Sequence, residues 1–248
     1  MGNKSLDFLE MIKNGADNSH SIARIKDTSK VQQLVKNNAA AEKSTTKPTA
    51  NTILKRTISK KPAASTIAVI DTETNWYDEV MSIGVALADA ETFKCVEARY
   101  YIIDPEYRKG GMYSNVLNIV KSIPSVVASR DDAMSDIRGW LDSKNTSSLF
   151  AYNAKFDYGH MEELTSYEWF DIMRLAAYKQ YNSAIPETAE CCKTGRLKRG
   201  YGVQDILRML SGDYTYCETH NAVLDAMDEL KIVELMGHDL EVYEIARL

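Results

Sequence analysis

The most constraining feature of this sequence is an uninterrupted apolar run at residues 67–70, which is followed at once by Asp71 and Glu73. An apolar run without alternation is typical of a strand that is buried on both faces of a sheet. Two more strand-like segments, at residues 82–88 and 96–103, follow after short gaps. Short gaps favour an antiparallel meander. We therefore expect a sheet whose first three strands are antiparallel.

The rest of the chain alternates between strand-like and helix-like segments. Ser129 is a suitable helix N-cap, and Gly212 and Gly237 are typical helix terminators. Further strands are expected at residues 149–152 and 168–172, and helices at residues 129–141, 153–164, from 173 onward, 203–210 and 221–236. This order predicts an α/β fold with a mixed five-stranded sheet flanked by helices.

The composition changes near residue 65. The chain has 248 residues, enough for one globular domain with an appendage. Residues 1–66 hold 12 of the 30 Lys and Arg but only 5 of the 35 Asp and Glu, which leaves 18 basic and 30 acidic residues in the remainder. We expect a basic, low-complexity and mostly disordered extension with short helices at residues 1–64, and a folded domain at residues 65–248.

A basic cluster directly precedes the expected domain and consists of Lys55, Arg56, Lys60 and Lys61. It fits a solvated linker. It also fits an electrostatic arm for nucleic acid, or a docking segment for a polymerase or another protein partner. The sequence leaves these interpretations open.

The four cysteines give no disulfide framework, and reduced thiols are expected. Cys217 and His220 form a C-x-x-H fragment, but a zinc site needs about four ligands and the chain offers no convincing second pair. No apolar stretch reaches the ~18 residues needed to cross a membrane, and residues 1–13 lack the apolar core of a signal peptide. A soluble cytoplasmic protein that does not enter a membrane is expected.

Asp71 and Glu73 stand two residues apart at the end of the first apolar run. Residues i and i+2 of an extended chain point to the same face, so the two carboxylates are expected side by side. A hard divalent cation would relieve their mutual repulsion. A D-x-E pair also arises by chance, so this pair alone is weak support for a metal site.

Two five-residue segments share the spelling Asn-Ala-x-apolar-Asp, and each is expected to open a helix. One runs from Asn153 to Asp157 and the other from Asn221 to Asp225. Each Asn is predicted to cap its helix, which places each Asp in the first turn. The helix dipole favours Asp in any first turn, so either segment alone says little about function. Together with the D-x-E pair, they indicate a carboxylate-rich site.

His220 immediately precedes the second of these helices, five residues before Asp225. A histidine at a helix start is usually a surface or capping residue. Imidazoles in general titrate near neutrality, which suits removal of a proton from water beside a metal ligand. The surrounding carboxylates favour this second interpretation.

These segments resemble the three motifs of the DEDDh 3′→5′ exonucleases, which include the proofreading epsilon subunit of DNA polymerase III and ribonuclease T. The matching segments are Asp71-Thr72-Glu73-Thr74, Tyr152-Asn153-Ala154-Lys155-Phe156-Asp157, and His220 with Asp225. The resemblance implies a ribonuclease H-like fold that holds two Mg²⁺ ions, with Mn²⁺ as a substitute. It implies that Asp71, Glu73 and Asp225 bind the first ion. Asp71 would also reach the second, Asp157 would support that ion directly or through water, and His220 would be the general base.

The resemblance also implies the reaction, which is hydrolysis of the terminal phosphodiester of DNA or RNA with release of nucleoside 5′-monophosphates. The role would be DNA proofreading or repair, or RNA trimming. The substrate would be nucleic acid with a free, single-stranded 3′ end. Substrate contacts are expected from Thr72, Thr74, Asn153 and Phe156. Trp76 and Tyr152 are aromatic and could stack on bases, or could simply pack.

The sequence departs from the family pattern at two places. Asn75 and Trp76 stand where many members have Thr-Gly, and Tyr152 stands where His is often found. Neither change removes a metal ligand, but both bear on how the terminal base is held. The alternative is a non-catalytic nucleic-acid-binding or scaffold protein on the same fold, because a fold alone does not determine function. The complete set of five catalytic-type residues favours an enzyme.

Overall fold

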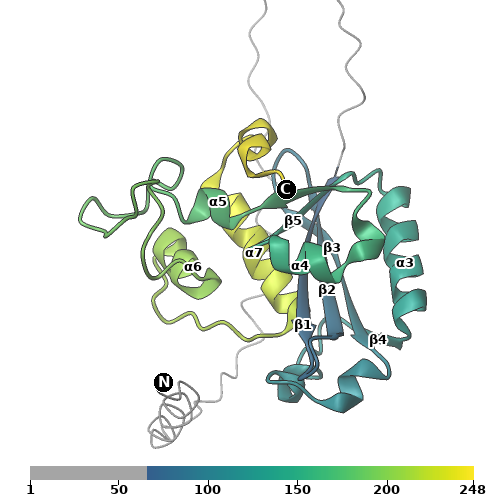
Figure 1. The fold of residues 1–248 in the computed structure, drawn as a ribbon. Coiled ribbons are helices and arrows are strands. Elements are labelled where there is room, and N and C mark those ends of the chain that lie inside the picture. Colours follow the sequence, from purple (N-terminus) through teal and green to yellow (C-terminus); the bar gives the residue numbers. More distant parts are fainter. Residues whose placement is uncertain (1–65) are drawn as a thin grey trace, which may run out of the picture. The chain divides into compact units, whose positions relative to one another are not determined.

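The structure is a computed structural model that describes residues 66–248 (Figure 1). The extension predicted at residues 1–64 and its basic cluster lie outside the described residues. The described chain forms an α/β fold in which helices pack on both faces of a mixed six-stranded sheet. The strand order is β4-β3-β2-β1-β5-β6.

The predicted antiparallel meander is confirmed. β1 (Thr66–Thr74), β2 (Val80–Asp89) and β3 (Cys95–Ile103) are consecutive antiparallel strands. β5 (Ser148–Ala151) lies parallel to β1 on its other side, and β6 (Glu168–Asp171) lies parallel to β5. Because β1 and β5 run in the same direction, the segments that follow their carboxyl ends meet at one edge of the sheet.

The predicted number of five strands is wrong, because β4 (Ser125–Ala128) adds a sixth at the edge of the sheet. β4 pairs in parallel with β3. Its two central side chains, Val126 and Val127, are exposed. The strand therefore lacks the alternation of apolar and polar residues by which a half-buried strand is recognised in a sequence.

Three helices lie close to their predicted positions: α3 (Arg130–Ser143), α6 (Val203–Ser211) and α7 (Ala222–Met236). Ser129 caps α3, as predicted, by accepting a hydrogen bond from the N–H of Asp132 at 3.2 Å. Gly212 and Gly237 end α6 and α7 in the left-handed conformation, which glycine adopts without strain.

The other helical elements are short. The helix predicted at residues 153–164 is broken into α4 (Lys155–His160) and the 3₁₀ turn η3 (Glu162–Leu164), and α5 (Met173–Ala176) is a single turn. The remaining 3₁₀ turns are η1 (Glu106–Lys109), η2 (Ser114–Val116) and η4 (Leu240–Ala246). Within residues 66–248, no helix has both the length and the apolar character needed to cross a membrane.

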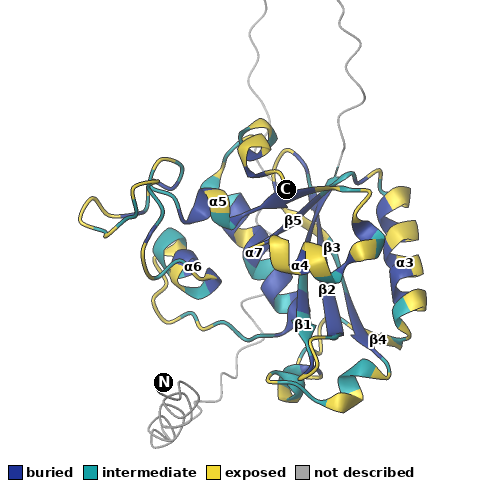
Figure 2. Ribbon diagram, viewed as in Figure 1, coloured by how far each residue is buried: buried dark blue, intermediate teal, exposed yellow. Residues whose placement is uncertain are grey.

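β1 is buried on both faces, as its apolar run predicts. Ile67 and Val69 pack in the cluster that includes residues of α5, α6 and α7, whereas Ala68 and Ile70 pack in the cluster that includes α3. The outer faces of α3 and α4 are exposed, and the strands behind them are buried (Figure 2). β1 is therefore the strand that both halves of the core share.

The start of α7 lies directly against β2 at Gly84. A Cβ at this position would come within 2.1 Å of the backbone carbonyl of Ala222, so only glycine permits the contact. Gly84 pairs in register with Asp71 on β1. The close contact therefore brings the first turn of α7 beside the acidic end of β1.

Candidate active site

Three separated segments meet at the carboxyl end of β1. The strand supplies Asp71 and Glu73, α4 supplies Asp157, and α7 supplies Asp225. Burial raises the pKa of Asp71 well above its usual range, and the charges of Glu229, Asp157, Asp225 and Glu73 raise it further. The four carboxylates that the sequence singled out therefore form one cluster.

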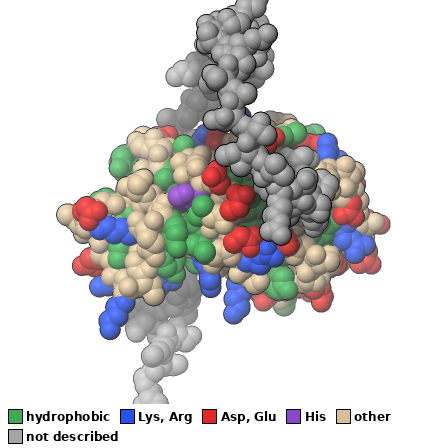
Figure 3. All heavy atoms as spheres, turned by 90° about the horizontal axis from the view of Figure 1, so that it is seen from above, with side chains coloured by type: hydrophobic (Ala, Val, Ile, Leu, Met, Phe, Trp, Pro, Cys, Tyr) green, Lys and Arg blue, Asp and Glu red, His purple; other side chains and the backbone are tan. Residues whose placement is uncertain are grey.

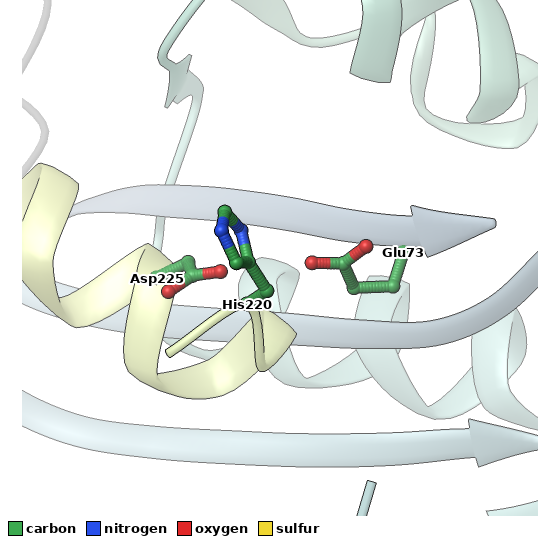
Figure 4. A group of neighbouring side chains, drawn as sticks. All are labelled: Glu73, His220 and Asp225. Atoms are coloured by element: carbon green, nitrogen blue, oxygen red, sulfur yellow. The ribbon is translucent and has the colours of Figure 1, made fainter. Parts of the chain in front are cut away.

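Glu73, His220 and Asp225 form a compact group within this cluster (Figure 4). Their ligand atoms all lie within 4.8 Å of one another, and the carboxyl group of Glu73 points from β1 toward the start of α7. His220 has a left-handed backbone conformation, with a φ of 56°. Its ring stacks on Tyr113, with 4.2 Å between the ring centroids. This stacking orients the imidazole beside the two carboxylates.

Asp157 is held in place by Thr72. Its Oδ1 accepts hydrogen bonds from the Thr72 N–H at 3.1 Å and from the Thr72 hydroxyl at 2.8 Å. Burial raises the pKa of Asp157 to about 7, although these two hydrogen bonds oppose the rise. The side chain of Thr72, which the sequence suggested as a substrate contact, is therefore engaged in positioning Asp157.

The pKa values of Glu73 and Asp225 are raised as well. Burial, followed by the charges of Asp225 and Glu218, raises the pKa of Glu73 to about 8. Burial, followed by the charges of Glu218 and Asp228, raises the pKa of Asp225 to about 8. Carboxylates this close repel one another, and a cation between them would stabilise their charged forms.

A further buried acid, Glu229, is not among the residues predicted from the sequence. It lies one helical turn after Asp225 on α7 and accepts a hydrogen bond from the N–H of Tyr152 at 2.9 Å. After burial, its charge makes the largest contribution to the raised pKa of Asp71. The signal that could have found it is its spacing, because residues i and i+4 share one face of a helix.

The cluster has the chemistry of a site for a hard divalent cation. Asp71 Oδ2 and Asp225 Oδ1 are buried and have no hydrogen-bond partner among residues 66–248. A buried carboxylate oxygen without a partner is costly unless it binds a cation, and hard cations prefer such oxygens. Cys217 is exposed and does not belong to this group of ligand atoms, so the C-x-x-H fragment gains no support as a zinc site.

A pocket of about 330 Å³ opens beside Glu73. It is lined by Glu73, Thr74, Asn75, Trp76, Asp78, Met112 and Tyr113. Trp76 is 66% exposed and Met112 is 62% exposed. Thr74 and Trp76 therefore lie in one hollow next to the candidate metal ligands. Tyr152, in contrast, is partly buried and donates its hydroxyl to the Tyr201 carbonyl.

Of the two Asn residues predicted to cap helices, only Asn221 occupies the capping position. Ala154 occupies the capping position of α4, and Asn153 has a left-handed backbone whose N–H donates to Asp171 Oδ1 at 3.0 Å. Asn221 does occupy the capping position of α7, but its side chain makes no capping hydrogen bond. Its amide instead donates to the hydroxyl of Tyr100 at 3.1 Å. Both residues serve tertiary contacts that their local sequence does not reveal.

No protein-family model and no curated protein matches the sequence. Among solved structures, the chain is similar to the nuclease domain of 3′hExo, a DEDDh family member, bound to rAMP. The identity is 13%, the match covers 71% of this chain and 92% of that chain, and the TM-score is 0.50. The fold is that of a DEDDh nuclease domain. This result confirms the fold that the sequence resemblance implied.

Two other solved structures are similar at comparable levels. A full-length 3′-exonuclease has 14% identity over 70% of this chain and 81% of its own, with a TM-score of 0.49. E. coli Exonuclease I in complex with an oligonucleotide has 14% identity over 69% of this chain, with a TM-score of 0.46. This chain covers only 40% of the length of that protein.

Proposed function

We propose that residues 65–248 form a metal-dependent 3′→5′ exonuclease domain that hydrolyses the terminal phosphodiester of nucleic acid and releases nucleoside 5′-monophosphates. One observation carries the proposal. On the fold of a DEDDh nuclease, four carboxylates and one imidazole from distant parts of the chain converge at the end of the central strand. The similar domain of 3′hExo is bound to rAMP, a nucleoside monophosphate of the proposed product class.

Divalent cations are the proposed cofactors, with Mg²⁺ as the natural ion and Mn²⁺ as a substitute. Asp71, Glu73 and Asp225 would hold one ion, and Asp71 with Asp157 would hold a second. The unpartnered buried oxygens of Asp71 and Asp225 support this assignment. When bound, such ions lower the pKa of the attacking water and stabilise the charge that develops on the phosphate.

His220 is the proposed general base. Its ring nitrogen is close enough to Glu73 and Asp225 to accept a proton from a water held at those carboxylates. Stacking on Tyr113 orients the ring for this transfer. Glu218 lies nearby, and its attraction to His220 opposes the rise that burial causes in the pKa of Glu218.

The pocket beside Glu73 is the proposed binding site of the terminal nucleotide. Trp76 offers an exposed ring there, and Thr74 lines the same hollow. Phe156 is 42% exposed on α4, which leaves part of its ring accessible to substrate. Asn153 uses its backbone N–H to bind Asp171, so its side chain is the part proposed to contact substrate. Stacking on aromatic rings accepts any base, as an exonuclease requires.

The proposal is tested with end-labelled single-stranded and duplex DNA and RNA, incubated with the full chain in Mg²⁺, Mn²⁺ or EDTA. The expected result is a ladder that shortens from the 3′ end, with nucleoside 5′-monophosphates as products and no reaction in EDTA. Internal cuts without such a ladder would contradict the exonuclease assignment. Binding without hydrolysis under every metal condition would favour the non-catalytic scaffold.

The biological role and the partners are part of the proposal. A preference for RNA in the same assay would indicate RNA trimming, and a preference for DNA would indicate proofreading or repair. Residues 1–64 stay a proposed attachment for a polymerase or another protein, which copurification with and without that segment would test. The cytoplasmic location stays a prediction from the sequence.

A further inference from the structure

A dense run of basic residues lies far from the catalytic motifs in the sequence. Residues 193–199 read Lys-Thr-Gly-Arg-Leu-Lys-Arg, with four cations and no acid. The sequence after residue 66 carries only 18 basic residues against 30 acidic ones, so this run stands out in an acidic domain. It belongs to the green loop that projects from the domain beside α5 and α6 in Figure 1.

The run closes a small hairpin, which comprises residues 190–199 and is called the basic hairpin here. Leu197 forms an antiparallel bridge with Cys191 and is buried. Lys193 and Lys198 are exposed on either side of this anchor, and Arg196 is partly buried. The hairpin presents its charges on a defined structure.

Three cations of the basic hairpin have no acidic partner among the described residues: Lys193, Arg196 and Lys198. The fourth, Arg199, pairs with Glu190 at 3.0 Å. Figure 3 shows Lys and Arg side chains next to acidic ones at the left end of the domain, the direction in which the loop of Figure 1 projects. The unpaired cations are the part of this mixed surface that is available to an anionic ligand.

A series of contacts leads from the base of the hairpin toward the candidate active site. The guanidinium of Arg196 lies 5.0 Å from the centroid of the Tyr201 ring. The Tyr201 carbonyl accepts a hydrogen bond from the Tyr152 hydroxyl, and the Tyr152 N–H donates to Glu229. Glu229 is one turn from Asp225 on α7. A series of contacts through Tyr201 and Tyr152 therefore links Arg196 to Glu229.

We propose that the basic hairpin binds the phosphate backbone of the strand whose 3′ end occupies the active site. This inference rests on the proposed exonuclease function and names the surface that holds the rest of the strand. An acidic domain repels a polyanion at long range, and local cations offset that repulsion. The release of counterions from the phosphates makes such contacts favourable and dependent on salt.

The test measures binding of fluorescein-labelled oligothymidine, about 20 nucleotides long, to the full chain in EDTA. Fluorescence anisotropy gives the affinity between about 50 and 200 mM salt. Lys193→Gln combined with Lys198→Gln should reduce the slope of log affinity against log salt by roughly 1.4, because each contact with a single strand contributes about 0.7. The same variant should lose more activity on the long strand than on a trinucleotide.

The matched control is Lys94→Gln combined with Lys144→Gln. Both lysines lie near the amino end of β1, where Thr66 donates to the Lys144 carbonyl, at the opposite end of the strand from Asp71 and Glu73. The control removes the same charge and should keep the wild-type slope. An unchanged slope in the hairpin variant, or an equal change in the control, would overturn the proposal. If the double variant fails to fold, Lys193→Gln alone should change the slope by about 0.7.

Two further results separate this inference from the proposed function. The wild-type chain could show no exonuclease activity while the hairpin variant still has a reduced slope of log affinity against log salt. That result would support the basic hairpin as a binding site and contradict the proposed exonuclease function. If the wild-type chain degrades strands from the 3′ end and the slope does not change, only the hairpin inference fails. Tighter binding of polyglutamate than of oligothymidine at equal salt would overturn nucleic acid as the ligand.

Discussion

The two segments with the spelling Asn-Ala-x-apolar-Asp fold differently although their sequences match. The first opens α4, a helix of 6 residues, and the second opens α7, a helix of 15 residues that packs against β1 and β2. Asp157 of the first accepts two hydrogen bonds from Thr72. Asp225 of the second has a buried oxygen without a partner among residues 66–248.

This difference shows what a short motif controls. The shared spelling places each Asp in the first turn of its helix. Tertiary contacts decide the rest, because Thr72 positions Asp157 before any ligand arrives, whereas Asp225 has an oxygen that only a ligand could satisfy. We therefore expect the α4 side and the α7 side of the cluster to respond differently to substitution, metal and pH.

The largest effect is expected at Asp71, whose pKa is raised first by burial and then by neighbouring acids that include the aspartates of both helices. Asp71→Asn removes the carboxylate common to both proposed metal positions. Turnover at saturating Mg²⁺ should fall at least ~10³-fold, because positioning and charge stabilisation both depend on it. The metal-free protein should melt at the same temperature or higher, since one member of a repelling cluster is gone. Near-normal turnover would show that Asp71 is not a shared metal ligand.

His220→Ala tests the α7 side alone. Turnover should fall by roughly 10²–10⁴-fold, the usual contribution of a positioned general base. Titration calorimetry should show unchanged Mg²⁺ affinity, and higher pH should partly restore the variant. A parallel loss of Mg²⁺ affinity would make His220 a metal ligand, which its position near Glu73 and Asp225 permits. Full activity would remove the general-base role.

Glu229 connects the two sides, because it lies on α7 and binds the N–H of Tyr152 ahead of α4. Glu229→Leu leaves that buried N–H without an acceptor and should lower the free energy of unfolding by ~1–3 kcal/mol. Glu229→Gln keeps an acceptor of the same size and removes the charge, so it should be more stable than the Leu variant. Denaturant melts measure both. Equal stability of the two variants would show that the hydrogen bond contributes nothing.

Thr72→Val tests the α4 side alone and should have a smaller effect. It removes the hydroxyl that donates to Asp157 and should lower the free energy of unfolding by ~0.5–1.5 kcal/mol. Turnover should fall, whereas the Mg²⁺ affinity of the ion proposed at Asp225 should change less, because only Asp157 loses a hydrogen bond. Thr72→Ser keeps the hydroxyl and is the control. Loss of activity in the Ser variant as well would point to the methyl group instead.

The smallest expected effect is the pH dependence of stability without metal. Burial and neighbouring acids raise the pKa of Glu73 and Asp225 to about 8 and burial raises that of Asp157 to about 7, whereas unfolded carboxyls titrate near ~4. Between about pH 4 and pH 8 the folded state therefore binds more protons than the unfolded state. This contribution to stability is fully present below about pH 4 and is lost as the pH rises through about 8.

Mg²⁺ binds the charged carboxylates and should compensate that loss. The rise in melting temperature on adding Mg²⁺ should therefore be larger at about pH 8.5 than at about pH 6. Asp225→Asn should shrink this difference more than Asp157→Asn, because Asp157 already has hydrogen-bond donors. A Mg²⁺ effect that does not change with pH would show that these carboxyls are not the ligands.

The elements that the sequence predicted are those whose signal is local. A few neighbouring residues are enough to predict the apolar run of β1, the glycines that end α6 and α7, and the serine that caps α3. β4 was not predictable in this way, since it pairs through its backbone and exposes both valines. The conformation of Asn153 depends on Asp171, a residue 18 positions away.

The candidate site follows the same division. The five catalytic-type residues could be named because their spacing matches a known pattern, and the structure places them together, while their roles stay proposals. Glu229 could not be weighed from the sequence, because its importance comes from burial and from the hydrogen bond to Tyr152. The hydrogen bond by which Thr72 holds Asp157 likewise joins residues 85 positions apart in the chain.

Gly84 determines how closely the first turn of α7 approaches β2 and the acidic cluster. A Cβ there would begin 2.1 Å from Ala222, whereas carbon atoms in ordinary contact are about 3.5 to 4.0 Å apart. Closely packed interiors transmit such strain. A residue with a side chain at position 84 would therefore displace the first turn of α7 by more than about 1 Å, and this shift would move Asp225 away from Asp71. A misplacement on this scale can cost on the order of 10²-fold in rate. The absence of a side chain at Gly84 thus sets the distance between Asp225 and Asp71 in the proposed active site.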